Sequence, residues 1–128
     1  MELPFVCSGN VIKGNQLGRT IGFPTANILP EDIAEFPLKN GVYAVDVLVM
    51  SQLFQGMANV GVKPTFGQNQ MTIEVHIFDF TEDIYGESMI VTFQNYIREE
   101  RKFPGVDALK EQIAKDEIMI RNILSDRV

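Results

Sequence analysis

Several strand-like stretches, separated by turn residues, constrain the fold of this chain more than any other feature. They cover residues 42–50, 53–60, 72–80 and 88–96, and they are rich in the β-branched and aromatic residues that favour strands. In residues 72–80 the pleat separates two faces. One face carries Ile73, Val75 and Ile77, and the other carries Thr72, Glu74, His76 and Phe78. Residues 61–67 are predicted to form a loop, because Pro64 cannot donate to a sheet ladder.

A different pattern follows in residues 107–124, which contain no Gly or Pro. Apolar side chains recur at helical spacing, at Leu109, Ile113, Ile120 and Leu124. Asp107 is expected to cap this helix, and Glu111–Lys115 and Glu117–Arg121 are i,i+4 pairs in the favourable order. The Gly- and Pro-rich first forty residues are expected to form loops and short extended pieces. Short strands followed by one amphipathic helix predict an antiparallel barrel capped by that helix.

Composition narrows the class of protein. The 128 residues carry a net charge of −6, which disfavours nonspecific binding to a phosphate backbone. Cys7 is the single cysteine, so the sequence predicts no internal disulfide and no structural zinc site. No apolar run approaches the ~20 residues of a membrane span. We therefore expect one cytoplasmic domain over residues 1–128, monomeric, with no nucleic-acid or membrane partner.

Polar residues in the first part of the chain suggest an anion or metal site. The glycines are Gly9, Gly14, Gly18 and Gly22, and their spacing matches neither a Walker A loop nor a dinucleotide-binding fingerprint. This spacing is a weak signal for an anion site, and turns between short strands are the more ordinary interpretation. Thr25 and Asn27 are two residues apart, so in an extended segment both face the same way. Their oxygens could complete the shell of a phosphate-bound Mg²⁺, or they could satisfy backbone groups in a turn.

Two further candidates lie later in the chain. Glu74 is mid-strand, beside His76 on one face, and this carboxylate either faces solvent or is placed to accept a proton. His76 is interpreted as a structural neighbour of Glu74 and not as a metal ligand. Arg98, Arg101 and Lys102 form a basic cluster before the helix, which is either a solvated loop or a phosphate clamp.

Short motifs recur along nearly the whole chain in a fixed order. They are GNVIKG (9–14), GRTIGFPTAN (18–27), NGVYAV (40–45), ANVGVKPTF (58–66), EVHIFDF (74–80), DIYGE (83–87) and IREERKF (97–103). From about residue 5 to residue 124 this order resembles the riboflavin kinase domain. The most specific elements are the PTAN segment and the downstream strand that begins at Glu74.

The resemblance implies a six-stranded antiparallel Greek-key barrel with one C-terminal α-helix. It also implies a phosphotransferase with an alcohol acceptor, which converts riboflavin and Mg·ATP to FMN and ADP. In this reading Thr25 and Asn27 bind Mg²⁺ and the nucleotide phosphates, and Glu74 is the catalytic base facing the ribityl 5′-hydroxyl. Arg98 falls in the loop that closes over the flavin. The flap over the phosphates corresponds to Gly14, Gly18, Arg19 and Gly22.

The chain departs from the family pattern in two respects. Bacterial members usually carry this domain behind an adenylyltransferase domain with a histidine-rich motif, whereas His76 is the single histidine of this sequence. We therefore expect no FAD synthesis from this chain, which is either a single-function enzyme or a domain excised from a bifunctional one. Residues 103–106 read Phe-Pro-Gly-Val where Phe-Asp-Ser-Leu is more usual, and Pro104 stiffens that loop. The alternative function is a flavin- or nucleotide-binding regulatory module of the same fold with little turnover.

Overall fold

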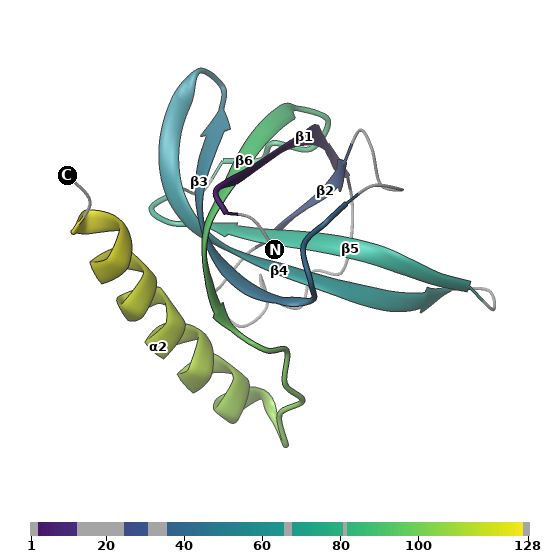
Figure 1. Ribbon diagram of the computed structural model, residues 1–128, viewed down its shortest axis with the longest axis vertical. Coiled ribbons are helices and arrows are strands. Elements are labelled where there is room, and N and C mark those ends of the chain that lie inside the picture. The colour runs from purple at the N-terminus through teal and green to yellow at the C-terminus, as the bar shows by residue number, and fades with distance from the viewer. Residues whose placement is uncertain (1–2, 13–24, 31–35, 66–67, 81, 127–128) are drawn as a thin grey trace.

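The computed structural model describes residues 3–12, 25–30, 36–65, 68–80 and 82–126. Within these residues six strands close an antiparallel barrel and a single helix follows (Figure 1). The strands are β1 (Phe5–Ile12), β2 (Ala26–Pro30), β3 (Gly41–Val49), β4 (Gln52–Thr65), β5 (Gln68–Ile77) and β6 (Ser88–Arg98), and the helix is α2 (Val106–Ser125). The predicted six-stranded barrel with a C-terminal helix is confirmed.

The strand order around the barrel is β1-β2-β5-β4-β3-β6. Strands β3, β4 and β5 form a meander of two hairpins, and β2 returns to pair with β5 at its far edge. This arrangement is a Greek key. Strand β1 then joins β2 to β6 and closes the barrel. Because every pair is antiparallel, residues that are opposite each other in the register lie on the same face of the wall.

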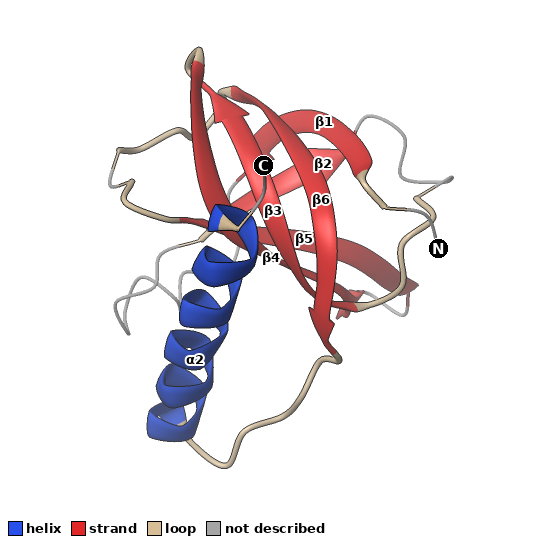
Figure 2. Cartoon of the chain, turned by 60° about the vertical axis from the view of Figure 1, so that its left-hand side comes forward, coloured by secondary structure: helices blue, strands red, loops and turns tan. Residues whose placement is uncertain are grey.

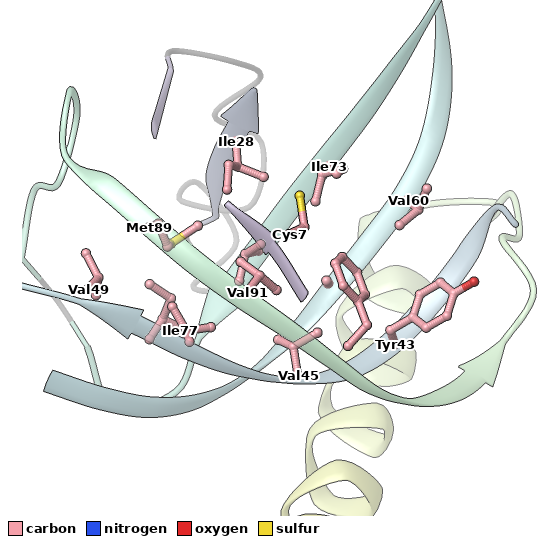
Figure 3. Close-up of a cluster of buried hydrophobic side chains, with 14 of the residues drawn as sticks. Cys7, Ile28, Tyr43, Val45, Val49, Val60, Ile73, Ile77, Met89 and Val91 are labelled. Atoms are coloured by element: carbon pink, nitrogen blue, oxygen red, sulfur yellow. The ribbon is translucent and has the colours of Figure 1, made fainter. Parts of the chain in front are cut away.

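The interior of the barrel is filled by alternate residues of the strands, as period-2 patterning predicts (Figure 3). Tyr43 and Phe93 are fully buried there, with their rings 5.3 Å apart at 90°. The predicted apolar face of residues 72–80 is confirmed, since Ile73, Val75 and Ile77 all lie in this core. The same alternation holds in β6, where Met89, Val91 and Phe93 are inaccessible to solvent.

Helix α2 packs against the outer surface of the wall and not in its interior (Figure 2). Ile120 and Leu124 meet a second apolar cluster, which consists of Val42, Ala44, Met57 and Phe78. The helix confirms the expected amphipathic segment, but the prediction that Asp107 caps it is wrong. Gly105 is the N-cap residue and no side chain bonds the first turn, where Asp107 instead contributes its negative charge. Over the described ranges, no helix has both the length and the apolarity needed to cross a bilayer.

Two other expectations need correction. The segment 61–67 was expected to be a loop, yet β4 continues through Thr65, and Pro64 is in register with Asn69 of β5. The pairing of β4 with β3 ends at Val60, so Pro64 lies where β4 has a neighbour on one side only, a position that tolerates a missing N–H. The first forty residues also contain more structure than expected, because β1 and β2 both belong to the closed wall.

Candidate active site on the outer wall

Three polar residues from three adjacent strands form a row on the outside of the barrel. Asn27 of β2 is directly opposite Glu74 of β5, and Glu74 is directly opposite Asn59 of β4. Directly opposed residues of antiparallel strands have Cβ atoms about 4.5–5.5 Å apart. The sheet register therefore brings together a carboxylate and two side-chain amides that are far apart in the sequence.

The outward direction of this row follows from its neighbours. Val75 is next to Glu74 in the chain and lies in the barrel interior, so the pleat turns Glu74 outward. Asn59 is opposite Val42, and Val42 is covered by helix α2 on the outer surface. Glu74 and Asn59 are half-buried and Asn27 is buried. The row thus begins at the edge of the surface that α2 covers and runs away from the helix.

The structure sets Asn27 opposite Glu74, and the family resemblance assigns both residues to one site. Thr25 is half-buried and immediately precedes β2, so it lies next to this row in the chain. The predicted phosphate-binding residues lie outside the described residues; they are Gly14, Gly18, Arg19 and Gly22.

Arg98 does not lie in a loop, as the resemblance implied, because it is the last residue of β6 and is bound to the helix. Its Nη2 donates to Asp116 Oδ2 at 2.8 Å, and its Nε lies 3.1 and 2.9 Å from Oδ1 and Oδ2 of the same carboxylate. Asp116 is 2% exposed and also accepts a hydrogen bond from Gln112 Nε2 at 2.9 Å. Arg98 Nη1 donates to the backbone carbonyl of Glu99 at 3.0 Å. Arg98 therefore fixes the start of the connection 99–105 to the middle of α2.

The connection 99–105 reaches back to the row. A Cβ on Gly61 would collide with the Glu100 carboxylate, so the missing side chain at Gly61 lets Glu100 lie against β4. Gly61 is two residues after Asn59 and on the same face of the strand. Arg101 and Lys102 of the predicted basic cluster are exposed in this connection, and Pro104 is exposed as well. The connection thus begins at an ion pair and borders the row of polar residues.

A second ion-pair network links the end of β5 to α2. His76 Nε2 lies 3.7 Å from Glu117, which pairs with Arg121 at 2.9 Å. Arg121 also binds Asp79 at 3.1 Å, and this hydrogen bond, together with the guanidinium charge, lowers the pKa of the Asp79 carboxyl. His76 therefore faces the helix through Glu117. These contacts hold the strand that carries Glu74 in a fixed position relative to the helix.

The donor set of the site limits the metal that it could hold. Among the described residues, no group of three or more His, Cys, Asp or Glu side chains is placed to hold a metal ion. Amide and hydroxyl oxygens from Asn27 and Thr25 suit a hard cation that keeps waters and phosphate oxygens as its other ligands. The residues present therefore fit Mg²⁺ that arrives with a nucleotide, and they do not form a closed protein cage.

Sequence reasoning missed two residues of this region. Asn59 and Gln55 are the polar residues of the segment 53–60, and hairpin pairing of residues 53–60 with 72–80 would have brought Asn59 opposite Glu74. Asp116 falls within the apolar stripe of the helix, between Ile113 and Ile120 at helical spacing. A carboxylate in such a stripe signals a buried partner, because a buried charge is stable only when it is paired.

Comparison with known proteins agrees with this geometry. Residues 1–124 match the protein family described as riboflavin kinase. A bifunctional riboflavin kinase/FMN adenylyltransferase from Haemophilus influenzae is 51% identical over 114 residues, which are 88% of this chain and 36% of that protein. An RNA-binding riboflavin kinase, RibR, from Bacillus subtilis is 47% identical over 112 residues, which are 87% of this chain and 47% of that protein. This chain therefore spans less than half the length of these two relatives.

A solved structure shares the fold over almost the whole chain. Riboflavin kinase from Trypanosoma brucei superimposes with a TM-score of 0.71 at 30% sequence identity, covering 96% of this chain and 81% of the other. The barrel, its outer helix and the matched sequence thus agree. The chain belongs to the riboflavin kinase family.

Proposed function

We propose that this chain is a single riboflavin kinase domain that transfers the γ-phosphoryl group of ATP to the 5′-hydroxyl of riboflavin, giving FMN and ADP. The observation that carries the proposal is the register of β2 with β5, which sets Asn27 opposite Glu74. A carboxylate and a neutral oxygen ligand on the same outer face suit a hydroxyl acceptor next to a metal-bound phosphate. Membership of the family supports the same substrates.

Glu74 is the proposed general base. Its position on a strand held on both sides by the barrel fixes the carboxylate, so it can orient the hydroxyl and accept its proton. Phosphoryl transfer depends mostly on positioning and on stabilising charge, and a general base adds about 10²–10⁴ in rate.

Thr25 and Asn27 are the proposed side-chain ligands of Mg²⁺, which neutralises phosphate charge when it is bound. Gly14, Gly18, Arg19 and Gly22 are proposed to contact the ATP phosphates, as the family resemblance implies. Arg98 is proposed to act through the connection 99–105. The ion pair with Asp116 supports this role, because it fixes the residue from which that connection starts.

The proposed partners are riboflavin and ATP in the cytoplasm. RNA binding is part of the name of the Bacillus subtilis relative, and the adenylyltransferase activity is part of the name of the bifunctional ones. A net charge of −6 supports the absence of nonspecific RNA binding by this chain. Retention of RNA by the purified protein at physiological salt would contradict that expectation.

The test is FMN and ADP formation from riboflavin, ATP and Mg²⁺. Glu74→Gln is expected to lower kcat at least about a hundredfold while riboflavin still binds, because the amide keeps the shape but cannot take the proton. Glu82→Gln, at an exposed carboxylate away from the row, is the matched control and should leave kcat unchanged. Near wild-type turnover in Glu74→Gln would remove Glu74 from the mechanism. Flavin binding without product in the unaltered protein would select the regulatory module.

A further inference from the structure

Asn59 holds a buried acceptor that none of the described residues satisfies. Its Oδ1 atom is inaccessible to solvent and accepts no hydrogen bond from that part of the chain. Buried polar atoms in folded proteins nearly always have a partner, and an exception calls for an explanation. The atom lies in the same row as Glu74, so the explanation concerns the proposed active site.

The described residues around Asn59 supply no donor to its Oδ1 atom. Val42 and Glu74 lie directly opposite it on the outer face, and the side chains with donors on that face, Thr72 and His76, are at the diagonal positions, where neither bonds Asn59 Oδ1. Next to them the Glu100 side chain lies against Gly61. Ionised carboxylates only accept hydrogen bonds, and apolar side chains do neither. A molecule bound at this row can supply a donor to Asn59 Oδ1.

The chemistry of that donor follows from the pair of acceptors. Phosphate oxygens that carry no proton cannot satisfy an amide oxygen, so the nucleotide phosphates are excluded as its partner. A polyol offers one O–H per carbon, and facing residues on neighbouring strands are close enough to bind two adjacent hydroxyls. Entry of such a chain requires the Glu100 side chain to move aside, which a side chain at the start of an exposed connection can do.

We propose that Asn59 is a substrate-binding residue that selects the ribityl chain, its Oδ1 accepting a hydrogen bond from the 4′-hydroxyl while Glu74 receives the 5′-hydroxyl. The inference rests on the proposed function and assigns a further residue to the same site. In this arrangement Asn59 selects the acceptor alcohol and Asn27 binds the metal-bound phosphate. Glu74 lies between them.

The experiment measures kcat/KM for the phosphorylation of riboflavin and of 4′-deoxyriboflavin. The unaltered protein is expected to prefer riboflavin by about ten- to hundredfold in kcat/KM, because a site built to bind a hydroxyl disfavours an analogue without it. In Asn59→Leu the two flavins should be used almost equally, since riboflavin loses its partner and the analogue had none. Asn95→Leu, at an exposed strand position away from the row, is the matched control and should keep the full preference.

Other outcomes would overturn the proposal. A preference for riboflavin that persists in Asn59→Leu places the 4′-hydroxyl elsewhere. A changed Mg²⁺ dependence with an unchanged preference assigns Asn59 to the metal. Asn59→Asp keeps an acceptor at the same position, so it should keep the preference even if its turnover falls, and loss of the preference there contradicts the proposal as well.

Thermal unfolding of the flavin-free protein is an independent measurement. Removing an unsatisfied acceptor should leave the Tm of Asn59→Leu equal or higher. A markedly lower Tm in both Asn59→Leu and Asn59→Ala would mean that the amide has a partner in the free protein, contrary to the proposal.

The result also separates this inference from the kinase activity. If the unaltered protein forms no FMN, the proposed function fails, and quenching of flavin fluorescence then measures the affinities of both flavins for the unaltered protein and for Asn59→Leu. A preference that disappears in the variant supports Asn59 as the ribityl-binding residue. Equal affinities in the unaltered protein, or no flavin binding, overturn it.

Discussion

Removal of the Asp116 carboxylate should be among the most destabilising single changes outside the barrel interior. The Arg98 side chain is 14% exposed, and Asp116→Ala leaves its guanidinium group without its two-oxygen acceptor. The change also removes the acceptor of Gln112. Breaking a buried pair by deleting one partner costs about 3–5 kcal/mol. A domain of this size is stable by about 5–15 kcal/mol, so the loss is a large share of the total. With an unfolding entropy of about 2.1 cal/mol/K per residue, 128 residues give a fall in Tm of about 15 °C.

Urea unfolding at neutral pH measures this loss directly. Glu111→Ala removes a partner from the exposed pair Glu111–Lys115, whose charged atoms are 3.5 Å apart, and should cost less than about 0.5 kcal/mol. The double variant Arg98→Met/Asp116→Leu should be more stable than Asp116→Ala, because apolar side chains leave no unpaired charge. The reasoning is refuted if Asp116→Ala loses less than about 1 kcal/mol, or if the double variant is no better than the single one.

Three other predictions concern the metal, a close backbone approach and a buried phenol. Asn27→Ala should raise the Mg·ATP concentration needed for the half-maximal rate by at least about tenfold, with riboflavin binding unchanged. An unchanged dependence of the rate on Mg²⁺ concentration would contradict the ligand assignment. Gly56→Ala should destabilise the barrel by about 1–3 kcal/mol in urea unfolding, because a Cβ there would lie 2.7 Å from a carbonyl oxygen of the neighbouring strand. Gly105→Ala, with open space around it, should cost less, about 0.5–1 kcal/mol, because Gly105 is the N-cap residue of α2 and alanine is disfavoured there. Burial, and then the nearby Tyr96, raise the pKa of Tyr43 to about 12. The stability from the neutral phenol should therefore be complete below pH 10 and be lost as pH rises toward 12, and Tyr43→Phe should flatten that part of the stability profile.

Local periodicity predicted the elements whose faces differ most in polarity. The alternation around Glu74 and the helical spacing from Leu109 to Leu124 both predicted the correct buried face. In a half-buried strand and in an amphipathic helix, apolar residues recur with the period of the element, so the sequence shows which face is buried. The strand boundary at Pro64 was predicted wrongly. The missing N–H of a proline disrupts a strand only where a neighbouring strand would accept its hydrogen bond, and the local sequence does not show that β3 ends its pairing at Val60.

The candidate site was predictable in part. Asn27 and Glu74 were identified through family motifs, and their meeting depends on β2 pairing with β5 across a long connection. Asn59 and Asp116 were missed because their importance lies in what faces them. An unsatisfied amide oxygen and a buried carboxylate are properties of packing, and they become visible only when all six strands and the helix are in place.

Alternate residues of strand β5 have two different roles, one in the barrel interior and one on the outer face. Val75 fills the barrel, while Glu74, its immediate neighbour in the chain, faces outward beside Asn27. A slip of one residue in the register would turn the Glu74 carboxylate into the apolar barrel interior and place Val75 on the outer wall. Burying an unpaired carboxylate in the apolar interior costs much free energy, so the slipped register is strongly disfavoured. The alternation that stabilises the fold therefore also keeps Glu74 on the outer face.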